Sequence, residues 1–456
     1  MTLKVDLSLV KKYNRPGPRY TSYPTAPHFT DAVKLSDWDT VIQNNNLNAK
    51  KDLSLYVHLP FCDTLCWFCG CTTVITRNTD KIDQYLEILF REIELLKSKI
   101  HKNRKIVQMH YGGGTPTYLS PGQIKSLGKK IQNSFNLSEN AEIGCEMDPR
   151  GLTRDHIIAL RETGFNRASM GVQDFNPEVQ KAVNRINPPE MIRQVIGWIR
   201  SEGFNSLNLD LIYGLPLQTA DSFKKTLDMV LELNPDRLAV FNYAHVPWLK
   251  PHQKLIREEE LPHPDEKLEM LKMIIETLTS SGYVYIGMDH FAKADDELSL
   301  AQKAKTMQRN FQGYSTKGGV DIYALGMSSI SQVDNIYVQN FKEISRYTEL
   351  IKNDTLPFEK GFILSKDDLV RREVIMRLMC DLELNYKNMS NSLNIDFQNY
   401  FSEDLKGLDL FEEDKLITFN EHGFKVTESG RLFIRNIAMI FDVYLEDNHA
   451  RYSKTI

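Results

Sequence analysis

The sequence predicts an α/β protein with a partial (β/α)6-type barrel of parallel strands, an N-terminal arm and a mainly helical, winged-helix-like C-terminal domain. Two observations carry this prediction. Between residues 51 and 290, short apolar runs alternate with longer amphipathic ones, which indicates repeated strand–helix–strand units. Polar and glycine-rich residues follow the apolar runs, as they do where parallel strands end at a binding face. An open doubly wound sheet shares both features, and the number of strands does not separate the two folds.

The predicted elements alternate in order along the barrel region. The strand candidates are short apolar runs, and the helix candidates show the longer spacing of an amphipathic helix. The predicted strands are 53–59, 105–111, 141–147, 166–172, 206–212, 237–243 and 283–288. The predicted helices lie near 80–100, 120–135, 153–163, 188–202, 218–233 and 264–281. From about residue 290 the pattern loosens.

The chain divides into four predicted parts. These are an arm with a lead-in helix (1–50), the barrel (51–290), a barrel extension with a linker (291–364) and a helical lid domain (365–456). The last part is predicted to contain helices, a short hairpin and a final helix. This order resembles a winged-helix arrangement, for which DNA binding is the usual function. Its 12 Lys and Arg against 17 Asp and Glu, counted from residue 366 to the end, argue against that function.

Composition limits the remaining choices. The chain has 456 residues, of which 41% are hydrophobic and 25% charged, so it can bury a large core. Its net charge of −4 argues against non-specific nucleic-acid binding. The sequence lacks an apolar run of about 18 residues, and its first residues lack the apolar segment of a signal peptide. We therefore expect a cytoplasmic protein with neither membrane nor nucleic-acid partners.

The carboxyl ends of the predicted strands collect polar groups on one face. Because parallel strands end at the same edge, these groups are expected to form one site. In strand order they are the cysteine loop, the GGGTPT segment, Glu146 and Asp148, Gln173, Asp210, and the NYAH segment. The glycines of GGGTPT let a backbone approach a polar ligand closely. A phosphate loop is the rival interpretation, but the segment lacks the GK[ST] that such a loop uses.

Four of the six cysteines lie in the stretch HLPFCDTLCWFCGC. Cys62, Cys66 and Cys69 have the spacing C-x3-C-x2-C, and Cys71 follows two residues later. In a reducing cytosol such a cluster of thiols indicates metal binding or catalysis rather than disulfides. A structural zinc site favours two separated pairs, which this spacing does not provide. A [4Fe–4S] cluster held by three thiolates leaves one iron open, and a fourth thiolate from Cys71 would block it.

The cysteine spacing resembles the signature of the radical S-adenosylmethionine family. In this sequence the motif follows a predicted strand, carries aromatic Phe68 before its third cysteine, and precedes a glycine-rich segment at the end of the next strand. The resemblance implies a partial barrel with a [4Fe–4S] cluster. The open iron of that cluster binds S-adenosylmethionine, and electron transfer yields a 5′-deoxyadenosyl radical.

A closer resemblance covers essentially the whole chain. The sequence is similar to the oxygen-independent coproporphyrinogen III oxidases, which are dehydrogenases of haem biosynthesis. The matching stretches are YTSYPTAPHF, YVHLPFC…LCWFCGC, GGGTPTYL, MGVQDFN, VNR, NLDLIYGLP, FNYAHVP, GMDHFAK, RNFQGYST and LGMSSIS. Trp67 stands where a tyrosine is common, a change that we expect the protein to tolerate.

This resemblance assigns roles to residues. It implies that Cys62, Cys66 and Cys69 bind the cluster, and that Cys71 lines a cavity shared by a second S-adenosylmethionine and the substrate. The residues matching those around the first S-adenosylmethionine are Tyr56, Phe68, Gly113, Glu146 and Arg185. Those matching the second are Gly114, Thr115, Gln173, Asp210, Ala244 and Ile330.

The resemblance also implies the reaction. Two propionates of coproporphyrinogen III become vinyl groups in protoporphyrinogen IX, and two S-adenosylmethionine molecules are consumed without O2. An electron donor such as flavodoxin or ferredoxin would reduce the cluster, and the chain is expected to be a monomer. The acidic substrate needs cationic partners, for which Arg15 and Arg19 of the arm, with Arg309, are candidates.

One rival is a haem-binding chaperone of the same superfamily. Such relatives have Phe where Cys71 stands and lack the N-terminal arm, whereas this sequence has both the cysteine and the arm. The two remaining cysteines, Cys145 and Cys380, lie in apolar segments and are predicted to be plain buried thiols.

Overall fold

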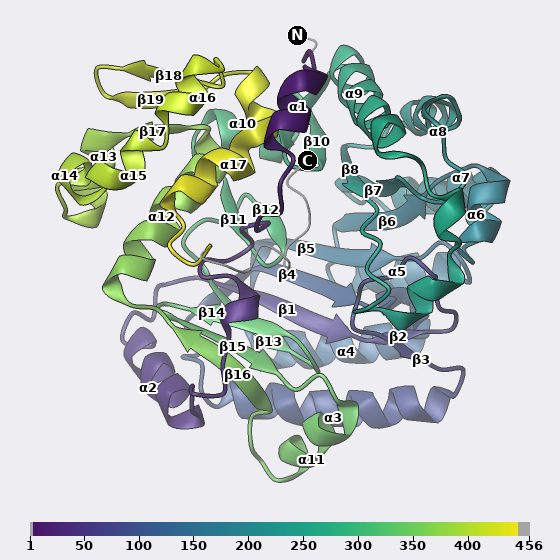
Figure 1. Ribbon diagram of the computed structural model, residues 1–456. Coiled ribbons are helices and arrows are strands. Elements are labelled where there is room, and N and C mark those ends of the chain that lie inside the picture. The colour runs from purple at the N-terminus through teal and green to yellow at the C-terminus, as the bar shows by residue number, and fades with distance from the viewer. Residues whose placement is uncertain (1–2, 446–456) are drawn as a thin grey trace. The chain divides into compact units, whose positions relative to one another are not determined.

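A computed structural model describes residues 3–445 of the chain, which form two compact units (Figure 1). The barrel unit contains residues 29–263 and 319–363. Of the described residues, the helical unit contains 3–28, 264–318 and 364–445. The division into four parts by sequence stays a prediction. No helix of the described residues is both long enough and apolar enough to span a membrane.

The barrel unit is built on parallel strands whose order in space follows their order in the chain. Each strand pairs in parallel with the next. The strands are β1 (Leu53–Leu59), β4 (Lys105–Gly113), β5 (Asn136–Met147), β6 (Arg167–Gln173), β7 (Ser206–Tyr213) and β8 (Arg237–Asn242). β1 is buried along almost its whole length, as is typical of parallel strands covered on both faces. The first six predicted strands are therefore confirmed.

Helices connect these strands, and the sequence predicts all of them except the short helix at 177–182. They are α3 (Thr79–Lys97), α4 (Pro121–Ser134), α5 (Arg154–Glu162), α6 (Pro177–Ala182), α7 (Pro189–Ser201) and α8 (Ala220–Leu233). Capping boxes set two of the starts, at Ser120 for α4 and at Thr219 for α8, because each side chain accepts from an otherwise unpaired helix N–H. α3 packs against α4, α4 against α5, and α5 against α7. The helices thus follow the strand order along the sheet, as in a partial barrel (Figure 1).

The other edge of this sheet comes from residues far along the chain. β13 (Asp321–Leu325) pairs in parallel with β1, and three antiparallel strands follow it. These strands are β14 (Ile330–Val333), β15 (Ile336–Asn340) and β16 (Phe358–Ile363). α11 (Ile344–Lys352) packs on α3, and α2 (Leu35–Asn45) packs on β14 and β15. The loosened pattern after residue 290 therefore contains a second neighbour for the strand that carries the cysteine loop.

A buried carboxyl group fastens this edge to α3. Glu92 is only 1% exposed and accepts hydrogen bonds from Tyr347 Oη at 2.6 Å, the Gly326 N–H at 2.7 Å and Asn340 Nδ2 at 2.9 Å. Burial raises its pKa to about 7, although these hydrogen bonds act in the opposite direction. Glu92 thereby fixes the turn between β13 and β14.

The helical unit begins with α1 (Leu7–Tyr13), and its residues 264–318 add two helices and two strand pairs. These are α9 (Pro264–Ser280), β9 (Tyr283–Gly287), β10 (His290–Lys293), α10 (Glu297–Lys303), β11 (Gln308–Asn310) and β12 (Gly313–Ser315). The predicted strand 283–288 does not continue the parallel series. It is β9 and pairs antiparallel with β10, because a tight turn at 288–289 returns the chain directly.

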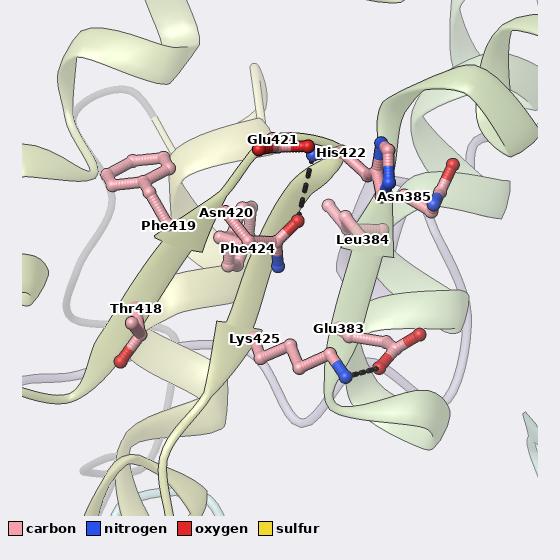
Figure 2. A pocket seen from close by; sticks show the side chains of 10 residues that line it. All are labelled: Glu383, Leu384, Asn385, Thr418, Phe419, Asn420, Glu421, His422, Phe424 and Lys425. Carbon is pink, nitrogen blue, oxygen red and sulfur yellow. Dashed lines mark hydrogen bonds and ion pairs between the residues drawn. The ribbon is translucent and has the colours of Figure 1, made fainter.

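The C-terminal part of this unit is helical with a small sheet. Its helices are α12 (Lys366–Asp381), α13 (Tyr386–Leu393), α14 (Phe397–Tyr400), α15 (Ser402–Lys406), α16 (Asp409–Glu413) and α17 (Ile434–Ala438). The predicted hairpin is β18 (Ile417–Asn420) with β19 (Gly423–Val426), and β17 (Glu383–Asn385) joins it as an antiparallel third strand. These strands line a pocket of about 540 Å³ (Figure 2). Lys425, which faces this pocket, pairs with Glu383 at 3.6 Å.

Residues 3–28 of the N-terminal arm are part of the core of the helical unit. Val10 and Tyr20 are fully buried, and the ring of Tyr13 stacks on Phe411 at 5.1 Å between centroids. Asn436 Nδ2 donates to the carbonyl of Tyr13 at 2.9 Å. Buried aromatic rings contribute a few kcal/mol each to stability. Removing the arm would therefore expose apolar core as well as remove its arginines.

Short 3₁₀ turns complete both units. They are η1 (Ala26–His28), η2 (Pro116–Tyr118), η3 (Pro251–Leu255), η4 (Glu258–Glu260), η5 (Ser429–Phe433) and η6 (Met439–Phe441). Of these, η2 and η3 lie next to segments that carry predicted site residues.

Candidate active site

The cysteine loop leaves the carboxyl end of β1 and is closed by a short parallel pair. β2 (Phe61–Cys62) pairs with β3 (Val74–Ile75). Within the loop, the Cys69 N–H donates to the carbonyl of Cys66 at 3.1 Å. Cys66 is buried and Cys62 and Cys69 are half-buried, whereas Cys71 is exposed. The three cysteines of the C-x3-C-x2-C motif therefore differ from the fourth in burial as well as in spacing.

Residues that follow β8 hold the last part of the loop. His252 Nε2 lies 2.8 Å from the carbonyl oxygen of Cys69, and Lys250 Nζ donates to the carbonyl of Cys71 at 3.0 Å. Gln253 is buried and hydrogen-bonds the same loop through its side-chain amide. These contacts satisfy backbone carbonyls that would otherwise be unpaired, and they fix where the thiols point.

The first thiol of the motif has a hydroxyl beside it. Thr115 Oγ1 lies 3.2 Å from Cys62 Sγ. Burial raises the pKa of the Cys62 thiol to about 12, although the hydroxyl acts in the opposite direction. Binding to a metal would have to displace this proton, because the thiolate is the ligand form.

Cys69 and Cys71 are linked by a hydrogen bond between their thiols. This bond lowers the pKa of Cys69, with burial acting against it, and raises the pKa of Cys71. The thiolate is the form of cysteine that binds a metal, so the lowered pKa of Cys69 agrees with its place in the C-x3-C-x2-C motif.

The donor set fits an iron–sulfur cluster. Cys62, Cys66 and Cys69 lie close enough for their charges to interact, so the three sulfurs share one site. Within residues 3–445, no three His, Cys, Asp or Glu side chains converge on a single point that could hold one metal ion. A cubane cluster does not require such convergence, because each thiolate binds a different iron atom.

The glycine segment packs tightly against the cysteine loop. Gly113 has a φ of +118°, and a Cβ there would lie 2.6 Å from the His58 ring. A Cβ at Gly114 would lie 2.5 Å from the carbonyl oxygen of Pro60. Both positions therefore require glycine, because the end of β4 must approach the end of β1 closely. From the sequence, these glycines are expected to let a ligand approach the backbone or to form a tight turn; their packing against the end of β1 is found only in the structure.

A belt of polar side chains crosses the sheet just below this loop. The Tyr56 and His110 rings are nearly parallel at 6.2 Å, and His110 Nε2 lies 3.4 Å from Glu146 Oε1. Glu146 also accepts from the Gly113 N–H at 3.0 Å. The belt continues through Ser169, Asn208 and Asp210, with Asn208 Nδ2 donating to Asp210 Oδ1 at 2.7 Å. These residues come from β1, β4, β5, β6 and β7 in turn.

The two carboxylates of the belt differ in pKa. Burial acts to raise the pKa of Glu146, but the hydrogen bond from His110 and the Gly113 N–H bring it below the usual value. Burial raises the pKa of Asp210 to about 6, with Glu146 adding to the effect and Asn208 opposing it. Glu146 is therefore an anion at neutral pH, suited to a cationic group of a ligand.

Arg185 adds an opposite charge to the same site. It follows α6, is 7% exposed, and pairs with Asp148 Oδ2 at 2.9 Å. Its Nη2 donates to the carbonyl of Gly171 at 2.6 Å, while its buried Nε has no hydrogen-bond partner. A buried N–H without an acceptor is uncommon and costs about 1–3 kcal/mol. A ligand with an anionic group would satisfy it.

Most of the predicted site residues lie on one face of the barrel unit. The structure places Tyr56 in β1, the cysteines and Phe68 after β1, Gly113, Gly114 and Thr115 at and after the end of β4, Glu146 in β5, Gln173 in β6 and Asp210 in β7. Gln173 has a positive φ of 69°, an unusual backbone conformation of the kind that concentrates at functional sites. Ala244 follows β8 and Ile330 begins β14. Their roles stay predictions.

Sequence reasoning missed several residues of this face. His110, Ser169 and Asn208 lie inside predicted strands, where period-two patterns do not separate a ligand-facing polar residue from a solvent-facing one. Arg150 was also missed, although it follows Asp148 by two residues. The belt could have been predicted from polar residues that occupy equivalent positions along neighbouring strands. The buried thiols predicted at Cys145 and Cys380 are confirmed.

The predicted arginines lie in the helical unit. Arg19 forms an ion pair with Asp289, and Arg15 is exposed. Arg309 is 5% exposed, and its guanidinium carbon lies 4.5 Å from the centre of the Tyr314 ring. Its Nε and Nη2 donate to the carbonyl of Arg19 at 3.3 and 3.1 Å, and its buried Nη1 has no hydrogen-bond partner.

The fold and the cysteine site define a radical S-adenosylmethionine protein. Residues 56–230 match the family model described as the Radical SAM superfamily, and residues 364–433 match the HemN C-terminal domain. The chain is 46% identical over 450 residues to the oxygen-independent coproporphyrinogen III oxidase of Synechocystis, covering 98% of this chain and 96% of that protein. It is 47% identical over 440 residues to the protein of the same name from Escherichia coli, covering 96% of this chain and 95% of that protein.

The solved structures agree with these relatives. A structure of coproporphyrinogen III oxidase (HemN) from Escherichia coli, described as a radical SAM enzyme, superposes with a TM-score of 0.92 at 44% identity. The superposition covers 98% of this chain and all of that one. The chain belongs to the oxygen-independent coproporphyrinogen III oxidase family.

Proposed function

We propose that this protein converts two propionate side chains of coproporphyrinogen III into vinyl groups without O2, giving protoporphyrinogen IX in haem biosynthesis. Each propionate loses a hydrogen atom from its β-carbon, then CO2 and one electron, and a carbon–carbon double bond remains. The name shared by relatives that match nearly the whole chain supports the substrate. The observation that carries the proposal is the group of three thiols at the end of β1, set apart from an exposed fourth.

The rival function, a haem-binding chaperone of the same superfamily, is less well supported. The matches to the oxidases extend over 95% or more of each chain, so they include most of residues 1–50. The arm is bound into the core of the helical unit, and Cys71 is present beside Cys69. These are the two features by which the sequence separates the oxidases from the chaperones.

We assign the cofactors to the barrel unit. Cys62, Cys66 and Cys69 would hold a [4Fe–4S] cluster, which together with S-adenosylmethionine supplies a 5′-deoxyadenosyl radical. The Glu146 carboxylate would face an ammonium group, and the Arg185 Nε, which has no hydrogen-bond partner, would face a carboxylate. Tyr56, Phe68 and Gly113 would complete this first cofactor site. Gly114, Thr115, Gln173, Asp210, Ala244 and Ile330 would surround a second S-adenosylmethionine.

Charge complementarity supports the first of these assignments. An amino-acid group carries an ammonium and a carboxylate on the same carbon, and the site offers one anion and one cation. Glu146 and Arg185 come from β5 and the turn after α6, and both are fixed by hydrogen bonds to the protein. A site that holds both groups in place restricts where the bound cofactor can react.

The reductant, the compartment and the oligomeric state of the enzyme are further proposals. The radical chemistry requires a one-electron reductant, for which flavodoxin or ferredoxin is a suitable donor. We place the protein in the cytoplasm, where free thiols stay reduced, and we expect it to act as a monomer. The net charge of −5 from residue 366 to the end argues against nucleic-acid binding by the C-terminal domain.

An anaerobic assay tests the function. Protein reconstituted with iron and sulfide is incubated with coproporphyrinogen III, S-adenosylmethionine and a reductant, and the products are separated. Protoporphyrinogen IX, CO2 and 5′-deoxyadenosine are expected, with two S-adenosylmethionine molecules used per porphyrinogen. Tight binding of haem without any turnover would favour the chaperone instead.

The substrate carboxylates point to Arg309. Arg19 already pairs with Asp289, whereas Arg309 contacts neutral groups and keeps a buried N–H without a partner. A buried charge is stable only when it is paired or fully hydrogen-bonded. We therefore propose Arg309 as the principal propionate-binding residue, with Arg15 and Arg19 of the arm as further candidates. The planar guanidinium suits a carboxylate better than an ammonium does.

Replacing Arg309 by Met is expected to raise the KM for coproporphyrinogen III about thirtyfold, because a buried ion pair of this kind contributes roughly 2 kcal/mol or more. The KM for S-adenosylmethionine and the iron content should not change. Arg309→Lys is expected to recover part of the affinity. Steady-state kinetics with each substrate varied in turn provide the measurement.

The matched control is Arg346→Met, which removes a surface arginine paired with Glu349 on α11. It should leave both KM values unchanged. An unchanged KM for the porphyrinogen in Arg309→Met, with an intact thermal transition, would remove Arg309 from the binding site. These point variants are preferable to deleting about the first 25 residues, because the arm supplies core side chains.

A further inference from the structure

Two guanidinium groups point at the sulfur of one cysteine. Arg150 Nη2 lies 3.3 Å from Cys66 Sγ, and Arg185 Nη1 lies 3.6 Å from the same atom. Both distances fall within the range of N–H···S hydrogen bonds. The other two motif cysteines have different neighbours, a hydroxyl at Cys62 and a thiol at Cys69. Cys66 is also the most buried of the three.

A single carboxylate holds both arginines in place. Asp148 Oδ2 accepts from Arg150 Nη2 at 2.7 Å and from Arg185 Nη1 at 2.9 Å. Asp148 Oδ1 accepts from Arg150 Nε and from the Arg150 backbone N–H, both at 3.0 Å. Asp148 is 8% exposed, so these are buried, charge-assisted contacts with a fixed geometry.

The charges of this group do not cancel. Asp148 contributes one negative charge and the arginines contribute two positive ones, so a positive charge remains next to the Cys66 sulfur. Water is largely excluded, and the effect of that charge is therefore much larger than at a surface. Arg185 is also assigned to the cofactor carboxylate, whereas Arg150 has no role in the proposed reaction.

We propose that Arg150, oriented by Asp148, is a positioning residue that raises the reduction potential of the cluster bound through Cys66. Hydrogen bonds to cluster sulfurs and nearby positive charge stabilise the more negative, reduced state. The protein thus makes it easier for an external donor to reduce the cluster. This inference rests on the proposed cluster at Cys62, Cys66 and Cys69.

The test is a redox titration of the full-length, anaerobically reconstituted protein, followed by electron paramagnetic resonance. Arg150→Gln is expected to lower the potential, with at least a tenfold smaller equilibrium constant for reduction, or about 59 mV for one electron. Asp148→Asn is expected to raise it, because the negative charge is removed. Arg150→Lys keeps the positive charge but loses the planar guanidinium group. Its reduction potential should lie between that of Arg150→Gln and that of the unchanged protein.

Arg154→Gln is the matched control. Arg154 lies four residues further on, at the start of α5, and its guanidinium pairs with Glu202 on the surface. The potential of this variant should equal that of the unchanged protein. A merely structural role for Arg150 and Asp148 would lower the iron content of both variants without shifting their potentials in opposite directions.

The outcomes separate this inference from the proposed function. Potentials that are unchanged in both Arg150→Gln and Asp148→Asn, with a full cluster, would overturn the inference alone. Shifts of the same sign in the two variants would also overturn it. Unchanged protein that binds no iron and sulfide would overturn the proposed function together with the inference. Opposite shifts in proteins with four irons per chain would support both.

Discussion

Replacing Cys66 by Ser is expected to abolish both the cluster and all product formation. The alkoxide of serine is a harder ligand than a thiolate and a poor substitute at iron–sulfur sites. Cys66 is the buried member of the motif and receives hydrogen bonds from two arginines, so water cannot readily take its place. Iron and sulfide analysis of anaerobic protein should fall from four of each per chain to near zero.

The matched control for this substitution is Cys380→Ala. Cys380 is a fully buried thiol in α12 of the helical unit, and the change tests whether loss of any core thiol lowers iron content. We expect full iron and sulfide content and turnover in this variant, with a lower melting temperature. Stable zinc in place of iron in the unchanged protein would contradict the cluster assignment.

Replacing Cys71 by Ser is expected to leave four irons and four sulfides but to remove most protoporphyrinogen formation. Cys71 is exposed and hydrogen-bonded to Cys69, and its own pKa lies above the usual value, so it keeps its proton at neutral pH. A thiol next to the cluster can give or relay a hydrogen atom or a proton. Serine has nearly the same volume, but its O–H bond is too strong for the first of these roles.

Three results distinguish the roles of Cys71. Loss of iron would make it a cluster ligand, and normal turnover would make it a spacer that shapes the loop. Cleavage of S-adenosylmethionine without formation of protoporphyrinogen would show that Cys71 acts after the cofactor is cleaved. Lys250→Met tests the loop geometry separately, because it removes the contact to the Cys71 carbonyl without changing a sulfur.

The sequence predicts the barrel strands well because each is a short apolar run with a helix after it. It places strands at 53–59 and 206–212, and the structure has β1 and β7 there. The same local pattern at 283–288 gives an antiparallel hairpin instead. Pairing partners lie elsewhere in the chain, so a local pattern indicates a strand but not its neighbour. The parallel neighbour β13 was missed for the same reason.

The site was predictable to the extent that its residues stand in motifs. The cysteine spacing and the residues at strand ends could be identified, since both are read along the chain. The contacts of Arg150 with Cys66 and of Glu92 with Tyr347 join residues 84 and 255 positions apart. Such contacts depend on the register of the sheet, which no single segment encodes.

The pairing of β1 with β13 bears on how the chain is made. Leu53 of β1 pairs with Asp321, which a ribosome adds about 270 residues later. At about 5–20 residues per second, this delay lasts between roughly 14 and 54 seconds. Ile106 of β4 arrives after only about 50 residues, so one edge of β1 is covered early and the other stays open throughout. During translation the strand that bears the cysteine loop therefore presents an unpaired backbone edge, the kind of surface that chaperones protect from other chains.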